Sequence, residues 1–376
     1  MRIEADWLRA APTRAAMALL TEGGHRALAV GGCVRDALLG RPSADVDIAT
    51  DARPERVLAL ADAAGLRAVP TGLDHGTVSV LADGVPHEVT TFRRDVETDG
   101  RHARVRFSDD PADDARRRDF TMNALYAEAD GTLVDPLGGL PDLRARRVRF
   151  IGAPEDRIRE DYLRILRFFR FTAWHGRDLD ADGLAACAAH QAGIDRLSRE
   201  RVGHEMRRLL AAPDPAPAVA AMAAAGVLAR VLPGADPAAL APLVHLEGPR
   251  PPDWLRRLAV LGGDAGGLRL SRAEAKALET LRAAEGGPFA LGHALGADRA
   301  ADALLIRAAS IGAPLDPAAL AAAEAGAAAA FPLVAADLMP DLGGPALGAA
   351  LERARALWTE SGGTLDAQAL KARLRD

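Results

Sequence analysis

The chain has 376 residues, which is too long for one ordinary hydrophobic core and predicts two to four modules. Apolar residues make up 49% and charged residues 26%, values that are ordinary for a globular protein. The net charge of −5 conceals an asymmetry, because residues 141–210 hold 15 arginines against 11 acidic residues. A basic middle in an acidic chain is an indication of a polyanionic partner.

Several classes of protein are not expected. The two cysteines, Cys33 and Cys187, are too few for a disulfide framework or a cysteine-based zinc site. The opening MRIEADWLRA holds acidic residues and no long apolar core, so we expect no secretory signal. The most hydrophobic region, residues 318–339, is mostly alanine interrupted by charged residues and a proline, which favours packed helix over a membrane span. We therefore expect a cytoplasmic protein.

The first 150 residues mix strands with helices. RALAV (26–30) predicts a buried strand, and a helix can begin after the two glycines that follow it. ADVDIAT (44–50) alternates as a strand, and residues 54–65 form a helical pattern closed by Gly65. GTVSVLADGVPHEVTTF (76–92) predicts two strands joined by a turn at Asp83-Gly84. This mixture predicts an α/β module.

The chain then becomes less regular. Residues 94–116 are polar, rich in Asp and Arg and poorly periodic, so we expect a mobile loop. A helix is predicted around residues 119–125, followed by a hairpin at Asp130-Gly131 and a glycine turn at 138–139.

After Pro154 the pattern is helical. Apolar residues recur at helical spacing from Ile158 to Phe169, and Gly176 ends that helix. Ser198 can cap the next helix, whose expected inner face is Val202, Met206, Leu209 and Leu210. A proline cluster at 214–218 predicts a boundary, and Ala/Leu-rich helices with Pro or Gly breaks follow it.

Two carboxylates carry the first chemical signal. Asp45 and Asp47 stand at i and i+2 on the predicted strand, so their side chains point to one face. Carboxylates so placed repel each other unless a cation lies between them, and their oxygens suit Mg²⁺, which completes its shell with phosphate and water. Two such ions can activate an attacking hydroxyl and stabilise a leaving pyrophosphate. A bare Asp-x-Asp is more often a solvated strand edge.

The glycines upstream strengthen the chemical interpretation. Backbone N–H groups at Gly31-Gly32, ahead of a helix, can hold phosphates at the positive end of that helix. Arg35 can add a charge-assisted contact to a triphosphate, and Asp36 can orient Arg35 or cap a turn. Together these residues predict a site for a nucleoside triphosphate and its metal ions.

Ordered motifs give a resemblance to a known family. GGCVRDALLG followed by DVDIAT resembles the first motif of the tRNA nucleotidyltransferase and poly(A) polymerase family, within the polymerase-β-like nucleotidyltransferase superfamily. The order continues with a closing strand, a flexible loop, the second and third motifs, a nucleotide-binding helix and its supporting helix. Their sequences are EVTTFRRD (88–95), DGRHARVRF (99–107), RRDFTMNAL (117–125), DPLGGLPDL (135–143), EDYLRILRFFRF (160–171) and SRERVGHEMRRLL (198–210). Beyond residue 210 only GLRLSRAEAKAL (267–278) is similar, and faintly.

The resemblance implies residue roles in the head. Asp45 and Asp47 would be the metal ligands, and Glu88 stands where a third carboxylate can lie, although a surface strand glutamate fits equally. The implied triphosphate cradle is Gly31, Gly32 and Arg35. Asp119 and Asn123, expected at i and i+4 on one helical face, would contact the ribose. Asp119 can instead be only a helix cap, Arg93 is a candidate phosphate or loop contact, and Arg118 can be a local salt-bridge partner.

Asp161 and Arg164 carry the implied base recognition. Spaced at i and i+3, they can be a surface ion pair worth ~0.3–0.5 kcal/mol. The resemblance implies that they read the base edge instead: a carboxylate acceptor beside a guanidinium donor matches cytosine and adenine, and mismatches uracil and guanine. Arg167, one turn on, would reach the phosphates or steady the pair. No nucleic-acid template would be needed.

The resemblance implies a class II type tRNA nucleotidyltransferase that adds C, C and A to the 3′ end of tRNA from CTP and ATP, releasing pyrophosphate, with Mg²⁺. It implies an elongated molecule: an α/β catalytic head (1–150) with a mixed sheet, then an all-α neck (151–212) with the base-binding helix, and an RNA-binding helical body and tail (213–376). We expect neither a membrane nor an obligatory protein partner. None of the nine histidines precedes Asp, which argues against an appended phosphohydrolase domain.

Three other activities stay open. A bacterial poly(A) polymerase shares the motifs, but this chain has no basic tail. A partial enzyme would add only CC or only A, and a CC-adding enzyme would be expected to lack the flexible loop. A catalytically silent RNA-binding relative is disfavoured by the intact pairs Asp45/Asp47 and Asp161/Arg164.

Overall fold

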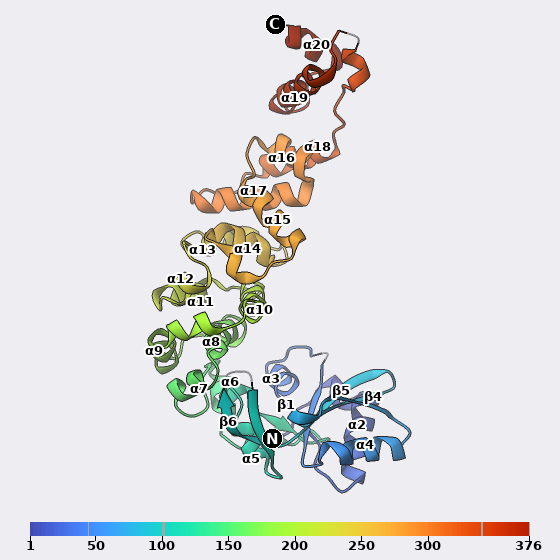
Figure 1. Cartoon of the computed structure of the whole chain (residues 1–376), viewed down its shortest axis with the longest axis vertical. Coiled ribbons are helices and arrows are strands. Elements are labelled where there is room, and N and C mark those ends of the chain that lie inside the picture. Colours follow the sequence, from blue (N-terminus) through green and yellow to red (C-terminus); the bar gives the residue numbers. More distant parts are fainter. Residues whose placement is uncertain (44, 100–101, 340, 376) are drawn as a thin grey trace. The chain divides into compact units, whose positions relative to one another are not determined.

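The computed structural model describes residues 1–43, 45–99, 102–339 and 341–375. The chain forms two compact units, Met1–Ser198 with Ala224–Arg230, and Arg199–Ala223 with Val231–Asp376. The first unit contains all the strands of the described chain, and the second is helical (Figure 1).

The first unit is built on a seven-stranded sheet of order β3-β4-β5-β2-β1-β8-β9. Neighbouring strands are antiparallel except β2 and β5, which run parallel. The strands are β1 (Leu28–Val30), β2 (Asp47–Thr50), β3 (Arg67–Gly72), β4 (Thr77–Ala82), β5 (Val85–Thr91), β8 (Tyr126–Ala127) and β9 (Leu133–Val134). The predicted α/β character of the head is confirmed, with a mixed sheet.

Local patterns account for much of this sheet. Strand β4 alternates buried Val78, Val80 and Ala82 with half-buried neighbours, because one face of the strand lies under helices α2 (Ala11–Glu22) and α4 (Pro54–Ala63), as Figure 1 shows. The predicted turn at Asp83-Gly84 is confirmed: both residues have positive φ, 49° and 79°, which suits a two-residue hairpin. The predicted hairpin at Asp130-Gly131 also forms, between β8 and β9.

The loop predicted for residues 94–116 is wrong over most of its length. Strands β6 (Arg93–Asp99) and β7 (His102–Phe107) form a separate antiparallel ribbon, and α5 (Pro111–Arg116) follows it. Residues 100 and 101, within the expected flexible loop, lie outside the described residues. A two-stranded ribbon is held by backbone hydrogen bonds and does not need a regular apolar face, so hydrophobic periodicity gives no signal for it.

The helix predicted around residues 119–125 is also wrong. Only a short 3₁₀ turn, η2 (Thr121–Asn123), forms there. The Asp119 carboxylate accepts from Phe120 N at 2.8 Å, and the Phe120 ring is buried against Phe150 and Phe171, with centroid distances of 4.9 and 5.2 Å. Burial of this ring and the start of β8 at Tyr126 override the local helical preference.

The helix predicted from residue 158 to Gly176 is interrupted. It forms α7 (Pro154–Glu160) and α8 (Leu163–His175), with an extended Asp161 (φ −153°, ψ 108°) between them. The Asp161 carboxylate accepts from Leu163 N at 3.1 Å and so helps to start the second helix. The end at Gly176 is confirmed. The other short elements of this unit are α1 (Asp6–Arg9), α3 (Gly32–Leu38), η1 (Leu73–His75), α6 (Leu140–Arg144), α9 (Ala181–Ala189) and η3 (Gln191–Arg196).

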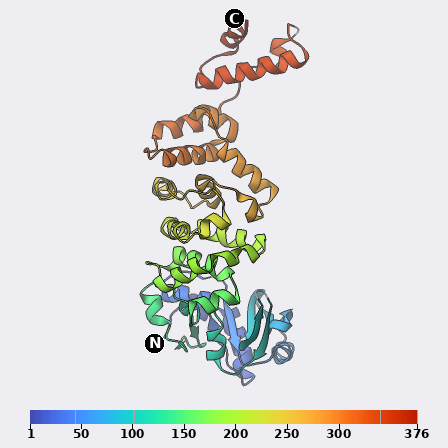
Figure 2. The same cartoon turned by 60° about the vertical axis from the view of Figure 1, so that its left-hand side comes forward.

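The second unit consists of short packed helices, as predicted for the Ala/Leu-rich half; Figure 2 shows those from α13 to α18, yellow to orange, as successive layers. The buried face predicted for α10 is confirmed. From residue 199 onward the elements are α10 (Arg199–Leu210), α11 (Ala216–Ala224), α12 (Val227–Val231), α13 (Leu240–Glu247), α14 (Trp254–Leu261), η4 (Ala265–Leu268), α15 (Arg272–Arg282), α16 (Pro288–Leu295), α17 (Ala297–Ser310), α18 (Pro317–Ala328), η5 (Ala335–Leu338), α19 (Gly344–Glu360) and α20 (Ala367–Arg375).

Buried charges tie several of these helices together. The carboxylate of Glu247, 3% exposed, accepts from Arg256 and from Arg257, with nitrogen–oxygen distances of 2.8 and 2.6 Å. Arg257 also donates to the carbonyls of Leu210 and Ala212, just where α10 ends. Among the described residues, no helix is both long and apolar enough to cross a membrane.

Candidate active site

The two candidate metal ligands lie where β1 ends and β2 begins. Val30 pairs with Asp47, so the glycine turn that follows β1 stands beside the carboxylates. Asp45 and Asp47 are exposed while Val46 and Ile48 are buried, which agrees with two carboxylates on a shared face, although β2 begins only at Asp47 and Asp45 precedes it. Ala44, the first residue of the predicted strand, lies outside the described residues.

A third carboxylate joins them through the parallel strand. Ile48 of β2 pairs with Val89 of β5, which brings Glu88 beside Asp47. The pKa of Asp47 is raised, first because surrounding protein removes part of its solvation and then because of the charges of Glu88 and Asp45, while Arg118 opposes the rise. Such crowding of negative charge is relieved by a bound cation.

The donor set fits a cation that shares its shell with a substrate. In the described part of the chain, no group of three or more His, Cys, Asp or Glu side chains is arranged to hold a metal on its own. Mg²⁺ commonly takes one or two carboxylates and completes its shell with phosphates and water, so Asp45 and Asp47 suffice for that arrangement.

The glycine turn is required by its backbone conformation. Gly31 has φ 76° and ψ −120°, a region closed to other residue types, and Gly32 begins α3. A Cβ at Gly31 would lie 3.4 Å from a terminal nitrogen of Arg118. The turn therefore presents backbone beside both a guanidinium group and the Asp47 strand.

Hydrogen bonds to two buried side chains fix the position of the Arg118 guanidinium. Its guanidinium donates to the buried carboxylate of Asp114 at 2.8 Å and to the Tyr126 hydroxyl at 3.2 Å. Arg118 is thus a salt-bridge partner, as one of the sequence interpretations proposed, and its charge also reaches Asp47.

A continuous polar network joins the remaining head residues. Asp36 accepts from Arg35 at 2.9 and 3.0 Å, and Arg35 donates in turn to Asn123 Oδ1 at 2.7 Å. Asn123 donates to Asp119 at 2.9 Å, and Arg167 closes the chain on the other Asp119 oxygen at 2.7 Å. Asp119 and Asn123 therefore meet as predicted, although through a 3₁₀ turn instead of an α-helical face.

The same network fixes the charge of Asp119. Burial alone would raise the pKa of this carboxyl, but the Arg167 charge and the hydrogen bonds from Asn123, Arg167 and Phe120 N–H outweigh it and hold the pKa below its usual value. Asp119 is therefore an ionised acceptor at neutral pH.

The candidate base-reading residues flank the helix break. Asp161 ends α7, and Arg164 lies in the first turn of α8, its backbone N–H bonded to the Asp161 carbonyl at 3.0 Å. The Arg164 guanidinium donates to Glu160 Oε2 at 2.5 Å and to the Arg157 carbonyl at 2.9 Å. Glu160 is a site neighbour that the sequence interpretation missed, although its spacing of four from Arg164 could have indicated it.

Arg93 and a buried histidine complete the surroundings. Arg93 begins β6, two residues after the strand that carries Glu88, and it pairs with Phe107. His175, which the sequence interpretation also missed, accepts from Arg41 at 3.2 Å on the segment leading to Asp45. Burial and nearby arginines lower the pKa of His175 to about 2, so this histidine is neutral and anchors that segment as an acceptor.

A mixed sheet that gathers carboxylates beside a glycine turn, next to a network of arginines, is the arrangement of a nucleotidyltransferase head. Comparison with known proteins agrees. Residues 27–149 match the family described as "Poly A polymerase head domain", and residues 178–239 match "Probable RNA and SrmB- binding site of polymerase A".

Individual relatives agree as well. A CCA-adding enzyme of Streptococcus pyogenes (serotype M2) is 43% identical over 207 residues, 54% of this chain and 50% of that protein. The mitochondrial CCA tRNA nucleotidyltransferase 1 of Homo sapiens is 41% identical over 199 residues, 51% of this chain and 45% of that protein. The chain thus spans about half the length of the curated relatives it matches.

A solved structure extends the similarity along the chain. The Bacillus stearothermophilus CCA-adding enzyme in complex with CTP is similar with a TM-score of 0.75 and 30% identity, over 99% of this chain and 98% of that one. The Thermotoga maritima CCA-adding enzyme complexed with tRNA shares the fold, with a TM-score of 0.72 at 19% identity over 100% of this chain and 98% of that one. The chain therefore belongs to the tRNA nucleotidyltransferase and poly(A) polymerase family.

Proposed function

We propose that this protein adds C, C and A to the 3′ end of tRNA, using CTP and ATP. The observation that carries the proposal is the crowding of the Glu88 and Asp45 charges around Asp47, whose strand begins beside the Gly31 turn. The similarity to enzymes named as CCA-adding supports the choice of reaction within the family. The 3′-hydroxyl oxygen of the RNA attacks the α-phosphorus, the bond to the β-phosphate breaks, and pyrophosphate leaves.

The carboxylates define the reacting end of the site. Asp45 and Asp47 would hold Mg²⁺, with Glu88 as a third carboxylate, and bound Mg²⁺ supplies activation of the hydroxyl and stabilisation of the pyrophosphate. The Gly31-Gly32 backbone and the Arg35 guanidinium would hold the triphosphate. Arg35 has donors to spare, because its contacts to Asp36 and Asn123 leave N–H groups on both terminal nitrogens.

The rest of the network orients the nucleotide. Asp119 and Asn123 would bind the ribose hydroxyls, and Arg167 would hold Asp119 in its charged form. Asp161 would accept from the exocyclic amine of cytosine or adenine, and Arg164 would donate to the ring nitrogen. Glu160 holds the Arg164 guanidinium in this structure, so a nucleotide must either share Arg164 with Glu160 or displace it. Arg93 remains a candidate phosphate contact.

The proposal also assigns a role to each of three regions of the chain. Residues 1–150 would be the catalytic head, 151–212 the neck with the base-reading residues, and 213–376 the RNA-binding body and tail. We propose that the protein acts in the cytoplasm, where it would encounter its tRNA substrate.

The test uses defined tRNA ends. The purified protein is incubated with tRNAs that end before CCA, after C and after CC, each with one labelled nucleoside triphosphate and Mg²⁺. Stepwise use of CTP, CTP and ATP, then a stop, is the expected result. Continued A addition would identify a poly(A) polymerase, a stop after CC or activity only on CC ends would identify a partial enzyme, and binding without transfer would identify a silent relative.

A further inference from the structure

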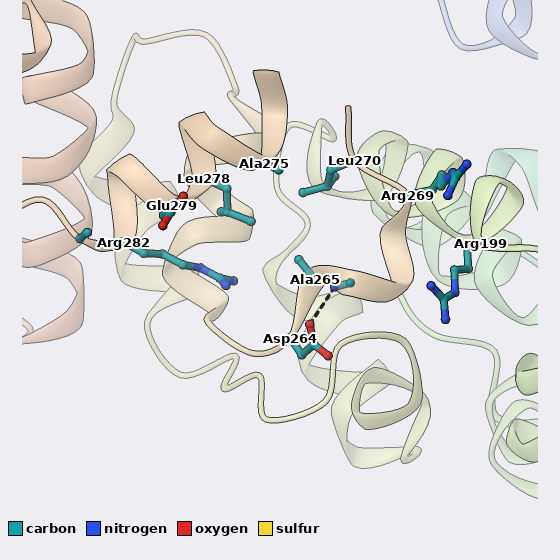
Figure 3. Close-up of a pocket in the computed structure, with 11 residues that line it drawn as sticks. Arg199, Asp264, Ala265, Arg269, Leu270, Ala275, Leu278, Glu279 and Arg282 are labelled. Atoms are coloured by element: carbon teal, nitrogen blue, oxygen red, sulfur yellow. Dashed lines mark hydrogen bonds between the residues drawn. The ribbon is translucent and has the colours of Figure 1, made fainter. Parts of the chain in front are cut away.

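A pocket of about 660 Å³ lies in the second unit, between α10, η4 and α15 (Figure 3). Its wall includes four residues of the stretch GLRLSRAEAKAL (267–278), which the catalytic site does not use: Arg269, Leu270, Ala275 and Leu278. Helix α10 and η4 approach so closely that a Cβ at Gly203 would meet the Leu268 carbonyl. The pocket is therefore built on a tightly fixed backbone, and its size lies in the ordinary range for ligand sites.

Two arginines at one end of the pocket contribute little to the fold. Arg199 is exposed on the first turn of α10, where a positive charge is unfavourable, and within the described residues its side chain has neither a hydrogen bond nor an ion pair. The side chain of Arg269 is 70% exposed and, among the described residues, pairs with Glu200 alone at 3.4 Å, while its φ of 49° is a strained conformation for a residue with a side chain. Figure 3 shows both side chains at this end, with their guanidinium groups pointing to different sides.

The remainder of the pocket is partly apolar. Leu270 and Leu278 lie between the arginine pair and the opposite end, where Arg282 and Glu279 stand (Figure 3). Arg282 is committed to the fold, since it donates to the carbonyls of Gly262 and Gly263 at 2.5 and 2.8 Å, and Asp264 accepts from Gly266 N–H at 2.8 Å. The cations that remain available are thus concentrated at one end, beside an apolar wall.

This combination matches one unit of a nucleic-acid strand, which is anionic at its phosphate and apolar on the faces of its sugar and base. We propose that the pocket binds one nucleotide of the tRNA, with the backbone phosphate between Arg199 and Arg269 and the sugar and base against Leu270 and Leu278. The inference rests on the proposed function in taking tRNA as the ligand. It adds a second contact point on the substrate, built by helices of the second unit.

The test measures binding of tRNA that lacks CCA, by fluorescence anisotropy over a range of salt concentrations. Arg199→Gln and Arg269→Gln should each weaken binding roughly tenfold, the effect of losing one charge-assisted hydrogen bond. The double variant should lower the slope of log K against log salt by roughly 0.7–0.9, corresponding to one phosphate. Arg272→Gln is the matched control, because Arg272 is an exposed arginine on α15 outside the pocket, and it should bind within about twofold of wild type.

Arg269→Gly separates binding from folding. Glycine adopts the backbone conformation of Arg269 without strain, so the unfolding midpoint should stay close to wild type while tRNA binding falls as in Arg269→Gln. Wild-type affinity in the Arg199 and Arg269 variants, or an equal loss in Arg272→Gln, would overturn the proposed pocket.

Turnover assays keep the two proposals apart. Variants that raise the KM for tRNA without changing the KM for CTP would support the pocket. If the wild-type protein binds tRNA through these arginines but transfers no nucleotide, the proposed reaction fails while the binding pocket stands.

Discussion

Asp119 is the point on which the polar network of the head converges, and Asp119→Asn tests its importance. Its carboxylate accepts from Phe120 N–H, Asn123 and Arg167. An asparagine has a single acceptor oxygen, so one of these donors would face an amide N–H. A buried donor without an acceptor costs ~1–3 kcal/mol. The lost ion pair adds only about 1 kcal/mol, because Arg167 is 31% exposed and solvent screens its charge. The free energy of unfolding should fall by ~2–4 kcal/mol.

The effect of this substitution should depend on pH. Because burial is outweighed by Arg167 and the hydrogen bonds from Asn123 and Phe120, the pKa of Asp119 is lower in the folded state than in the unfolded chain. The carboxylate therefore stabilises the fold above the unfolded-state pKa of about 3.9, and this contribution is lost as the pH falls through the lower, folded-state pKa. Wild type and variant should differ most near neutral pH and converge in acid.

Urea unfolding followed by circular dichroism at several pH values measures the difference, and single-turnover rates with CTP and dCTP report whether discrimination at the ribose falls. Asp156→Asn is the matched control: Asp156 is 69% exposed and paired with Arg159, so its loss should cost less than ~1 kcal/mol. A variant as stable as wild type at neutral pH, or a stability difference that persists unchanged in acid, would refute the reasoning.

Four further changes test other parts of the molecule. Asp47→Ala should abolish nucleotide addition without unfolding the protein, since it removes charge neutralisation at the phosphates; near-normal Mg²⁺-dependent turnover would exclude this residue from the site. Deleting residues 99–105 should spare C addition and impair the final A, and equal loss of both would indicate a folding defect. Asp161→Ala should slow CTP and ATP use and raise the relative use of UTP and GTP, whereas equal slowing of all four in single-turnover assays would make the residue structural. Glu247→Gln should lower the free energy of unfolding by ~3–5 kcal/mol, because the buried Arg257 loses its carboxylate partner and the buried Arg256 keeps only Asp302; a loss below about 1 kcal/mol in urea titration would contradict the buried-pair argument.

Features governed by local chemistry were predictable from the sequence. The turn at Asp83-Gly84 needs two residues with positive φ, and the exposure of Asp45 and Asp47 on either side of the buried Val46 follows the alternation expected of extended backbone. The family motifs identified the same head and predicted the meeting of Asp119 with Asn123.

Features governed by distant contacts were not predictable in this way. Helices α7 and α8 keep one apolar periodicity across the Asp161 break, so their pattern reads as continuous, and the β6–β7 ribbon has no periodic signal. The contact between Arg41 and His175 joins residues 134 positions apart, and no local pattern indicates it. The spacing of four residues between Glu160 and Arg164 could have indicated their contact. The two residues lie on either side of the helix break at Asp161, however, so helical spacing alone does not establish that they pair.

The aromatic contacts of Phe120 and Phe150 with α8 set a practical limit on how the head can be dissected. A fragment ending at residue 150 would keep every strand of the seven-stranded sheet but lose Phe168, whose ring stacks on Phe150 at 5.6 Å, and Arg167, the counter-charge of Asp119. Such a fragment would display two bare phenyl rings to water and tend to self-associate. The shortest head that retains these contacts runs through His175, so nucleotide-binding experiments on an isolated head should begin from that boundary.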